Sequence, residues 1–312
     1  MAVTTAEPLP RLPLPGPLAR GLTQLKSLGF GMLFLWPSIL LFSVFVFYPL
    51  IKSIYLGFYE SDPLGNQGDL VGFDQYRSVL GGSDFRHSLW ITFQFTMYTV
   101  VPGIVLGLGL AMLANQKLPA ISIFRTIFAS TVATSVAVAS MMWLTLLNPT
   151  TGLVTWILDQ FGQPRLNLLN DPDWALPAVA LTTIWLNLGL ATIVFLAGLQ
   201  SIPERLYESA RIDGAGRIGT FWHVTLPMLS PTMLFVTVVG TILAFESFGQ
   251  IHILTRGGPL DATNVIVYSI YQDAFQRFDY GVASVKAVGL FFLVLGLTAA
   301  QLRFLERRVF YQ

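Results

Sequence analysis

The sequence contains no cysteine and few charged residues. Among its 312 residues there is no Cys, and only 11% are Asp, Glu, Lys or Arg. The lack of Cys excludes disulfides, thiolate metal sites and a cysteine nucleophile. A water-soluble chain carries about 25% charged residues, whereas 54% of this chain is hydrophobic. With a mean hydropathy of +0.64, the apolar surface exceeds what a core could hide, so lipid must solvate much of it.

Several functional classes lack their signatures. The net charge of +1 gives no bulk basic field, so we expect no nucleic-acid partner. The three histidines are scattered without ligand spacing, and we expect no metal site. The phosphate-binding pattern G-x-x-x-x-G-K-[ST] is absent, and the one G-x-G-x-x-G match, 214–219, leads into an apolar run rather than following a strand. We therefore predict no enzyme activity and no cofactor in this chain.

Long apolar runs are what the sequence has in abundance. A bilayer core of roughly 30 Å needs about 20 apolar helical residues. Only Glu246 and Lys286 place a charge within runs of that length. We predict an all-α integral membrane protein with six transmembrane helices, at 30–51, 89–114, 127–147, 174–199, 232–251 and 282–302.

The arrangement of basic residues predicts the orientation. We expect a tail at 1–29, a six-span domain at 30–302 with a long inner loop at 200–231, and a second tail at 303–312. With the N-terminus inside, 11 of the 18 Lys and Arg residues fall on the cytoplasmic side. Because Lys and Arg gather in cytoplasmic loops, both termini are predicted to be cytoplasmic.

The long inner loop is predicted to contain a short helix. Pro203 followed by Glu204 is a favourable helix start, and Gly214 with Gly216 supplies a stop. Periodicity alone leaves open that this segment is an ordinary amphipathic connector.

The same loop carries a family motif. The pattern Glu-Ala-Ala, three residues, Gly, nine residues, Ile-x-Leu-Pro stands here as Glu208-Ser209-Ala210, Gly214 and Val224-Thr225-Leu226-Pro227, with every spacing kept. It resembles the signature of permease subunits of binding-protein-dependent ABC importers, and the resemblance covers roughly residues 30–312. Ser for Ala and Val for Ile are small departures.

The resemblance implies a role and a set of partners. In such importers this loop forms a coupling helix seated in a groove of a cytoplasmic ATPase, with residues here at Glu208, Ser209, Ala210, Arg211, Asp213 and Gly214. It also implies a second homologous permease, two ABC ATPases that hold ATP and Mg²⁺, and an extracytoplasmic solute-binding protein. The expected location is the bacterial plasma (inner) membrane.

Looser matches narrow the family. Two of them, Leu254-Thr-Arg-Gly-Gly-Pro259 and Leu147-Asn148-Pro149, resemble carbohydrate-type permeases of the maltose and glycerol-phosphate class. The ending at 301–312, with Ser61-Asp62-Pro63-Leu64-Gly65, is most similar to the first permease subunits of sn-glycerol-3-phosphate importers. A small polar solute is the expected cargo.

Polar residues within the spans are candidates for the substrate pathway. An ionisable group in a span costs roughly 2.5 to 3.5 kcal/mol at the centre and marks function by default. Aromatic rings and amides suit a polyhydroxylated ligand. The candidates are Glu246, Gln250, Trp185, Asn187 and Ser247. The alternative is that Glu246 and Asn187 only bond neighbouring helices.

The identity of the solute stays open at this point. A phosphate would meet a like charge at Glu246, whereas a choline ammonium or a sugar hydroxyl would not. A glycerophosphodiester such as glycerophosphocholine is therefore as plausible as sn-glycerol-3-phosphate. The alternatives are a maltose- or trehalose-like sugar importer, an ion-coupled secondary transporter using Glu246 and Lys286, and a membrane partner without a pathway.

Overall fold

The computed structural model describes residues 34–62, 65–116, 118–162 and 167–305. The chain divides into two compact units, Met1–Lys52 and Ser53–Gln312. The described part of the first unit is helical. It belongs to a 23-residue segment, Phe34–Leu56, that contains a π turn, η1 (Ser43–Phe47), and ends with α2 (Tyr48–Leu56). The predicted first span therefore continues to Leu56, and its residues 30–33 lie outside the described ones, as do the tail at 1–29 and most of that at 303–312.

The described residues of the second unit form helices, their connecting loops and one antiparallel hairpin. The hairpin pairs β1 (Tyr59–Ser61) with β2 (Gln67–Leu70). The helices and helical turns in chain order are α3 (Phe73–Leu80), α4 (Ser83–Ala114), α5 (Ile121–Ser130), η2 (Thr131–Ala133), α6 (Val136–Leu146), α7 (Leu153–Gln160), α8 (Ala175–Ser201), α9 (Glu204–Ile212), α10 (Arg217–Thr220), η3 (Phe221–Thr225), α11 (Leu226–Met228), α12 (Ser230–Phe245), α13 (Gly249–Leu254), α14 (Ile266–Tyr271), η4 (Gln272–Gln276) and α15 (Tyr280–Leu305).

The membrane-spanning segments agree only in part with the prediction. Four described helices are long and apolar enough to cross a bilayer, or up to six if each of two bent helix pairs is one span. The predicted second, fourth and sixth spans correspond to α4, α8 and α15. The third and fifth spans differ from the prediction, because each is bent and begins or ends elsewhere.

The third predicted span bends sharply in its middle. Ile121–Ala133 and Val136–Leu146 meet at 105°. Between them Ser135 has extended backbone, and its side chain accepts a hydrogen bond of 3.3 Å from the Val138 amide. A serine in this geometry caps a helix N-terminus, so the apolar run contains a new helix start.

The fifth predicted span ends earlier than expected. Arg217–Met228 and Ser230–Phe245 meet at 65°, and α12 stops at Phe245 rather than continuing to Ile251. Glu246 caps its C-terminus, and a separate short helix, α13, begins at Gly249. Glu246 therefore lies at a helix end rather than within a continuous helix.

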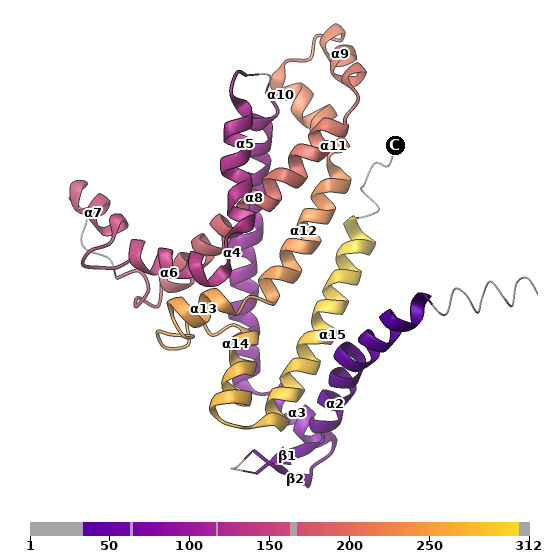
Figure 1. Cartoon of the computed structure of the whole chain (residues 1–312), viewed down its shortest axis with the longest axis vertical. Coiled ribbons are helices and arrows are strands. Elements are labelled where there is room, and N and C mark those ends of the chain that lie inside the picture. The colour runs from indigo at the N-terminus through magenta and orange to yellow at the C-terminus, as the bar shows by residue number, and fades with distance from the viewer. Residues whose placement is uncertain (1–33, 63–64, 117, 163–166, 306–312) are drawn as a thin grey trace, which may run out of the picture. The chain divides into compact units, whose positions relative to one another are not determined.

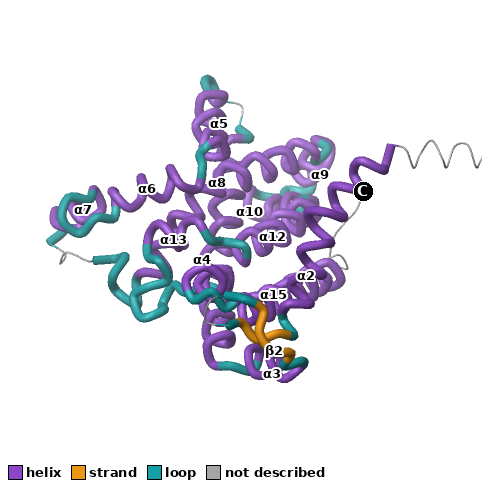
Figure 2. The backbone as a smooth tube through the Cα atoms, turned by 60° about the horizontal axis from the view of Figure 1, so that its bottom comes forward, coloured by secondary structure: helices purple, strands orange, loops and turns teal. Residues whose placement is uncertain are grey.

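Helix α4 packs against α8 and α12, and α12 also packs against α15 (Figures 1 and 2). Small residues allow the close approach. A Cβ on Gly107 would lie 2.8 Å from the Ala191 Cβ, and one on Gly198 would lie 2.5 Å from the Thr232 Oγ1. Without a hydrophobic force between helices in lipid, such contacts supply much of the association energy.

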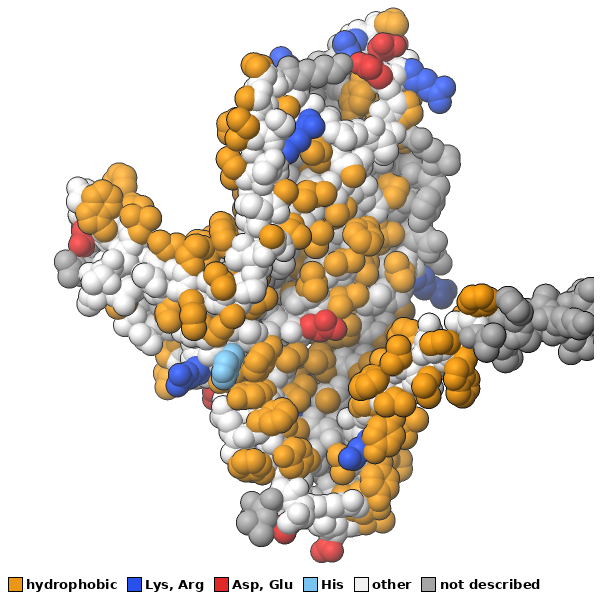
Figure 3. All heavy atoms as spheres, viewed as in Figure 1, with side chains coloured by type: hydrophobic (Ala, Val, Ile, Leu, Met, Phe, Trp, Pro, Cys, Tyr) orange, Lys and Arg blue, Asp and Glu red, His pale blue; other side chains and the backbone are white. Residues whose placement is uncertain are grey.

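The two ends of this helix group carry different elements. In Figure 1, α9 and α10 lie at one end, while α14, α3 and the hairpin lie at the other. In Figure 3, charged side chains gather over the α9–α10 end, and the face between the ends is largely apolar. An apolar belt between polar ends is what a bilayer requires.

Candidate functional site

The loop between α8 and α12 contains the predicted helix. Helix α9 starts after Pro203, which has extended backbone, and carries Glu204 in its first turn, where the helix dipole favours an acid. It stops at Asp213, and Gly214 follows with φ +77°. The amide of Ala215 donates to the carbonyl of Ala210 at 2.9 Å, which closes the helix end. Glycine suits this position because a left-handed backbone costs it no strain.

Exposure divides the residues expected to meet an ATPase. Ala210 is buried within this chain. The other five are exposed: Glu208, Ser209, Arg211, Asp213 and Gly214. The exposed residues thus form a surface that carries both positive and negative charges and ends at Gly214. The Ala210 methyl packs inside this chain instead.

Two exposed apolar side chains that were not predicted from the sequence flank this surface. Ile212 is 86% exposed and Ile218 is 77% exposed. Each directly follows an arginine in the chain: Ile212 follows Arg211, and Ile218 follows Arg217. Isolated apolar residues in a charged loop could have indicated these contact positions from the sequence, because a protein–protein interface combines apolar anchors with a polar rim.

A cavity forms where α12 ends. Its volume is about 330 Å³, and it is lined from α6, α8 and the α12–α13 connection. Four of the five predicted pathway residues line it: Asn187, Glu246, Ser247 and Gln250. The fifth, Trp185, does not, since its ring packs edge-on against Trp143 with centroids 6.2 Å apart.

Glu246 brings an uncompensated charge to this cavity. Its side chain is exposed, and it has no ion-pair partner among the described residues. It also caps the C-terminus of α12, where the helix dipole opposes a negative charge. Nearby, the buried Ser247 hydroxyl donates to the Gln250 Oε1 at 3.3 Å. The cavity therefore offers a carboxylate and a fixed amide to a ligand.

Gly249 makes the cavity wall possible. A Cβ at this position would lie 2.7 Å from the Val136 Cγ1, so α13 could not approach α6 as closely with a larger residue. Helix α6 begins after the bend at Ser135 and packs against α13. The bend in the third span and the break in the fifth thus build one site together.

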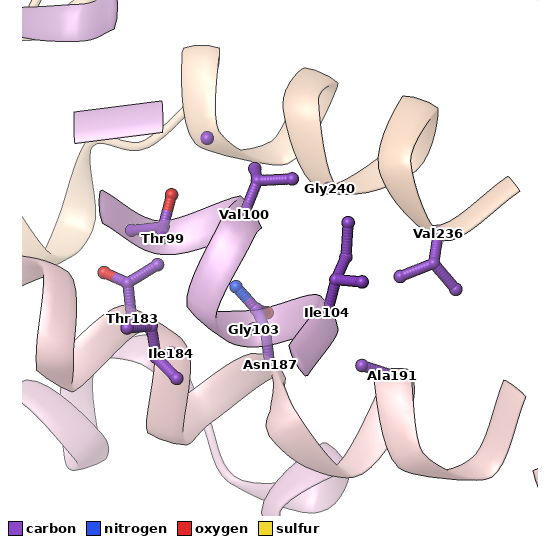
Figure 4. A pocket seen from close by; sticks show the side chains of 11 residues that line it. Thr99, Val100, Gly103, Ile104, Thr183, Ile184, Asn187, Ala191, Val236 and Gly240 are labelled. Atoms are coloured by element: carbon purple, nitrogen blue, oxygen red, sulfur yellow. The ribbon is translucent and has the colours of Figure 1, made fainter. Parts of the chain in front are cut away.

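Asn187 also faces a groove between α4, α8 and α12. Two further pockets of about 60 Å³ each include it among mostly apolar residues. Figure 4 shows its amide reaching from α8 into the space beside α4, near Thr99 and Ile104. The Thr99 hydroxyl donates to the Phe95 carbonyl at 2.9 Å and so is satisfied within its own helix. Asn187, by contrast, has no side-chain hydrogen bond within the described part of the chain, which leaves its amide available.

Lys286, the second charge in an apolar run, is paired. Its Nζ lies 2.6 Å from the Asp273 Oδ2 and donates to the Ser269 Oγ at 2.8 Å. Arg277 holds the other Asp273 oxygen at 2.7 Å. The pairing gives Lys286 a structural explanation, whereas an ion-coupled transporter would need it as a coupling charge.

Comparison with known proteins identifies the family. The model for "Binding-protein-dependent transport system inner membrane component" matches residues 82–311. The sn-glycerol-3-phosphate transport system permease protein UgpA of Rhizobium meliloti is 36% identical over 88% of this chain and 94% of its own length. The UgpA protein of Escherichia coli strain UTI89 is 32% identical over the same shares.

Solved structures agree with this assignment. A bacterial ABC transporter that imports the acidic polysaccharide alginate superposes with a TM-score of 0.80 at 25% identity, over 92% of this chain and 99% of that one. The same transporter type in complex with its alginate-bound periplasmic protein gives a TM-score of 0.79 at 24% identity, over 91% of this chain and 96% of that one. The chain thus belongs to the inner-membrane permease family of binding-protein-dependent ABC importers.

Proposed function

We propose that this chain forms half of the translocation pathway of an ATP-driven importer for sn-glycerol-3-phosphate or a glycerophosphodiester such as glycerophosphocholine. The observation that carries the proposal is that this chain has both an exposed helix, α9, at one end of the helix group and the Glu246 cavity, to which α12 leads. The UgpA names of relatives at 32% and 36% identity support the solute class.

The proposed mechanism is alternating access. A second, similar permease would complete the pathway, two ATPases would hold ATP and Mg²⁺, and an extracytoplasmic binding protein would deliver the solute. Closure of the ATPases would draw the coupling helices together and turn the spans from inward-open to outward-open. This chain would convert that motion into exposure of a site, with α9 cytoplasmic and both termini inside.

Surface chemistry supports α9 as the contact with the ATPase. Glu208 and Arg211 can pair with charges on a partner, and Ile212, at 86% exposed, offers an apolar anchor. Gly214 sets the direction in which the chain leaves the helix, because its φ of +77° suits glycine. The docking surface therefore depends on one backbone conformation.

A matched pair of glycine variants tests this role. Gly214→Val forces a β-branched residue into the left-handed region, whereas Gly216→Val falls at φ −71° and ψ 173°, which valine adopts readily. A Cβ meets nothing within 4 Å at either position, so only the backbone differs. We expect Gly214→Val to lose ATP-driven uptake while assembling in the membrane, and Gly216→Val to keep most of it. Equal uptake by the two variants would exclude Gly214 as a docking determinant.

A sugar importer is the second candidate. The fold likeness to the alginate importer, at 25% identity, favours it, as does the Ser247–Gln250 pair, whose polar atoms suit hydroxyls. Uptake by the complete transporter of labelled maltose, trehalose and sn-glycerol-3-phosphate, each with binding protein present, separates the two candidates.

A further inference from the structure

Three aromatic side chains form a row that ends at the Glu246 cavity. The row consists of Phe275 in η4, Tyr271 in α14, and Phe248 between α12 and α13. The ring centroids of Phe275 and Tyr271 are 5.4 Å apart, and those of Tyr271 and Phe248 are 4.9 Å apart. Such distances mean direct ring contact. The row is therefore continuous, although its members come from separate elements.

The row runs from an exposed end to the cavity. Phe275 is 62% exposed, and Phe248 lines the cavity of about 330 Å³ beside Glu246. Tyr271, which is partly buried, joins them. Each of the three rings keeps part of its surface accessible, from Phe275 at the exposed end to Phe248 beside the carboxylate.

Neighbouring rings hold the row in place. His252 stacks on Phe248 at 5.2 Å with 15° between the planes, and its centroid is 5.4 Å from that of Tyr271. The ring centroids of Tyr268 and Tyr271 are 5.8 Å apart, and Tyr268 is buried. Burial raises the pKa of the Tyr268 hydroxyl above its usual range, which keeps this ring uncharged to a still higher pH than an ordinary tyrosine. The supporting wall is therefore neutral there and packed.

The charge at the end of the row selects the ligand chemistry. Neither lysine nor arginine lines the cavity within the described residues, and the Glu246 carboxylate has no counter-ion there. Aromatic faces attract organic ammonium groups through the ring quadrupole, and a carboxylate adds to that attraction. A phosphate would be repelled by the same carboxylate. The charge of Arg256 acts on Tyr268 in the wall behind the row, so it is the cavity end, at Glu246, that is complementary to an organic cation.

We propose that Phe275, Tyr271, Phe248 and Glu246 form a binding track for the ammonium head group of a zwitterionic glycerophosphodiester. This inference rests on the proposed function and refines it. The ammonium end of the solute lies on this chain, and the phosphate end faces the remainder of the pathway. Selectivity for a cationic head group, as opposed to glycerol phosphate in general, is then a property of these four side chains.

The test uses the complete importer in proteoliposomes, with binding protein outside and ATP inside. Initial uptake rates are measured for glycerophosphocholine and for glycerophosphoglycerol, a diester without an ammonium group. We expect Glu246→Gln and Phe248→Leu to lower the ratio of the two rates about tenfold, the size of one strong cation–aromatic contact. Tyr271→Leu should lower the ratio, and Tyr271→Phe should leave it unchanged, because the ring remains.

Control variants change the same residue types elsewhere. Glu60→Gln alters an exposed carboxylate in β1, and Phe161→Leu alters a ring that is 77% exposed after α7. Both should keep the wild-type ratio. If Phe248→Leu abolishes all uptake, Glu246→Gln and Phe275→Leu decide the matter, since both side chains are exposed. An unchanged ratio in these two variants overturns the track, whereas a wild type that imports no glycerophosphate compound refutes the proposed function.

Discussion

The buried pair between Lys286 and Asp273 allows a quantitative prediction. The two side chains are 4% and 2% exposed, and their charged atoms are 2.6 Å apart. Breaking a buried pair by removing one partner costs about 3 to 5 kcal/mol, because the other charge stays buried without compensation. A cavity of about 380 Å³ borders both residues. Since water can approach through it, we place the cost near the lower end, about 3 kcal/mol.

The two single substitutions should differ in their effects. After Asp273→Leu, Lys286 keeps only the Ser269 hydroxyl, at 2.8 Å. After Lys286→Met, Asp273 keeps Arg277, whose guanidinium is 2.7 Å away and whose side chain is 61% exposed. Lys286→Met should therefore cost only about 1.5 kcal/mol, the size of one charged hydrogen bond. The double variant should recover most of the loss, because no buried charge remains.

Thermal unfolding of the purified complex in detergent measures these effects. We expect Asp273→Leu to give the lowest midpoint, Lys286→Met an intermediate one, and the double variant a value near that of the wild type. Additive losses in the double variant would show that the two residues do not interact. A lower midpoint for Lys286→Met than for Asp273→Leu would refute the assignment of Arg277 as the second partner.

Two further predictions test packing and orientation. Gly189→Ala should destabilise the complex by about 1 to 3 kcal/mol, since the new Cβ would overlap the Phe128 carbonyl. Gly109→Ala should be neutral or stabilising, because nothing lies within 4 Å of a Cβ at that position. The thermal unfolding midpoints of the two variants check this. Because the chain has no Cys, a single cysteine can report sidedness. A membrane-impermeant maleimide added to intact cells should label Leu260→Cys, at a position 89% exposed, and spare Asp213→Cys, and the reverse pattern would overturn the predicted orientation.

The sequence predicted the uninterrupted spans because their signal is local. α4, α8 and α15 are apolar runs whose length alone implies a bilayer crossing. The helix α9 was predictable for the same reason, since its start at Pro203 and its stop at Gly214 are short-range signals.

The bends in the third and fifth predicted spans were missed because hydropathy averages over helix breaks. Ser135, an N-cap residue inside the third apolar run, indicates a new helix start there. Glu246 and the nearby Gly249 indicate the helix break in the fifth run. Four residues that were singled out for their polarity, Asn187, Glu246, Ser247 and Gln250, line the cavity. Trp185 fell outside it because its partner, Trp143, is fixed by tertiary packing that no periodicity reveals.

The geometry of α12 links the end that carries α9 to α11 with the Glu246 cavity. Its 16 residues make a rod of about 24 Å that begins after the bend at Leu229 and ends at Glu246. Leu229 is fully buried, so the bend is held by packing. A displacement of α9 to α11 would therefore reach the Glu246 cavity through one rigid element. Because α12 stops at Phe245 and Glu246 caps it, that motion would move the carboxylate relative to α13 and α6, and so change the shape of the site.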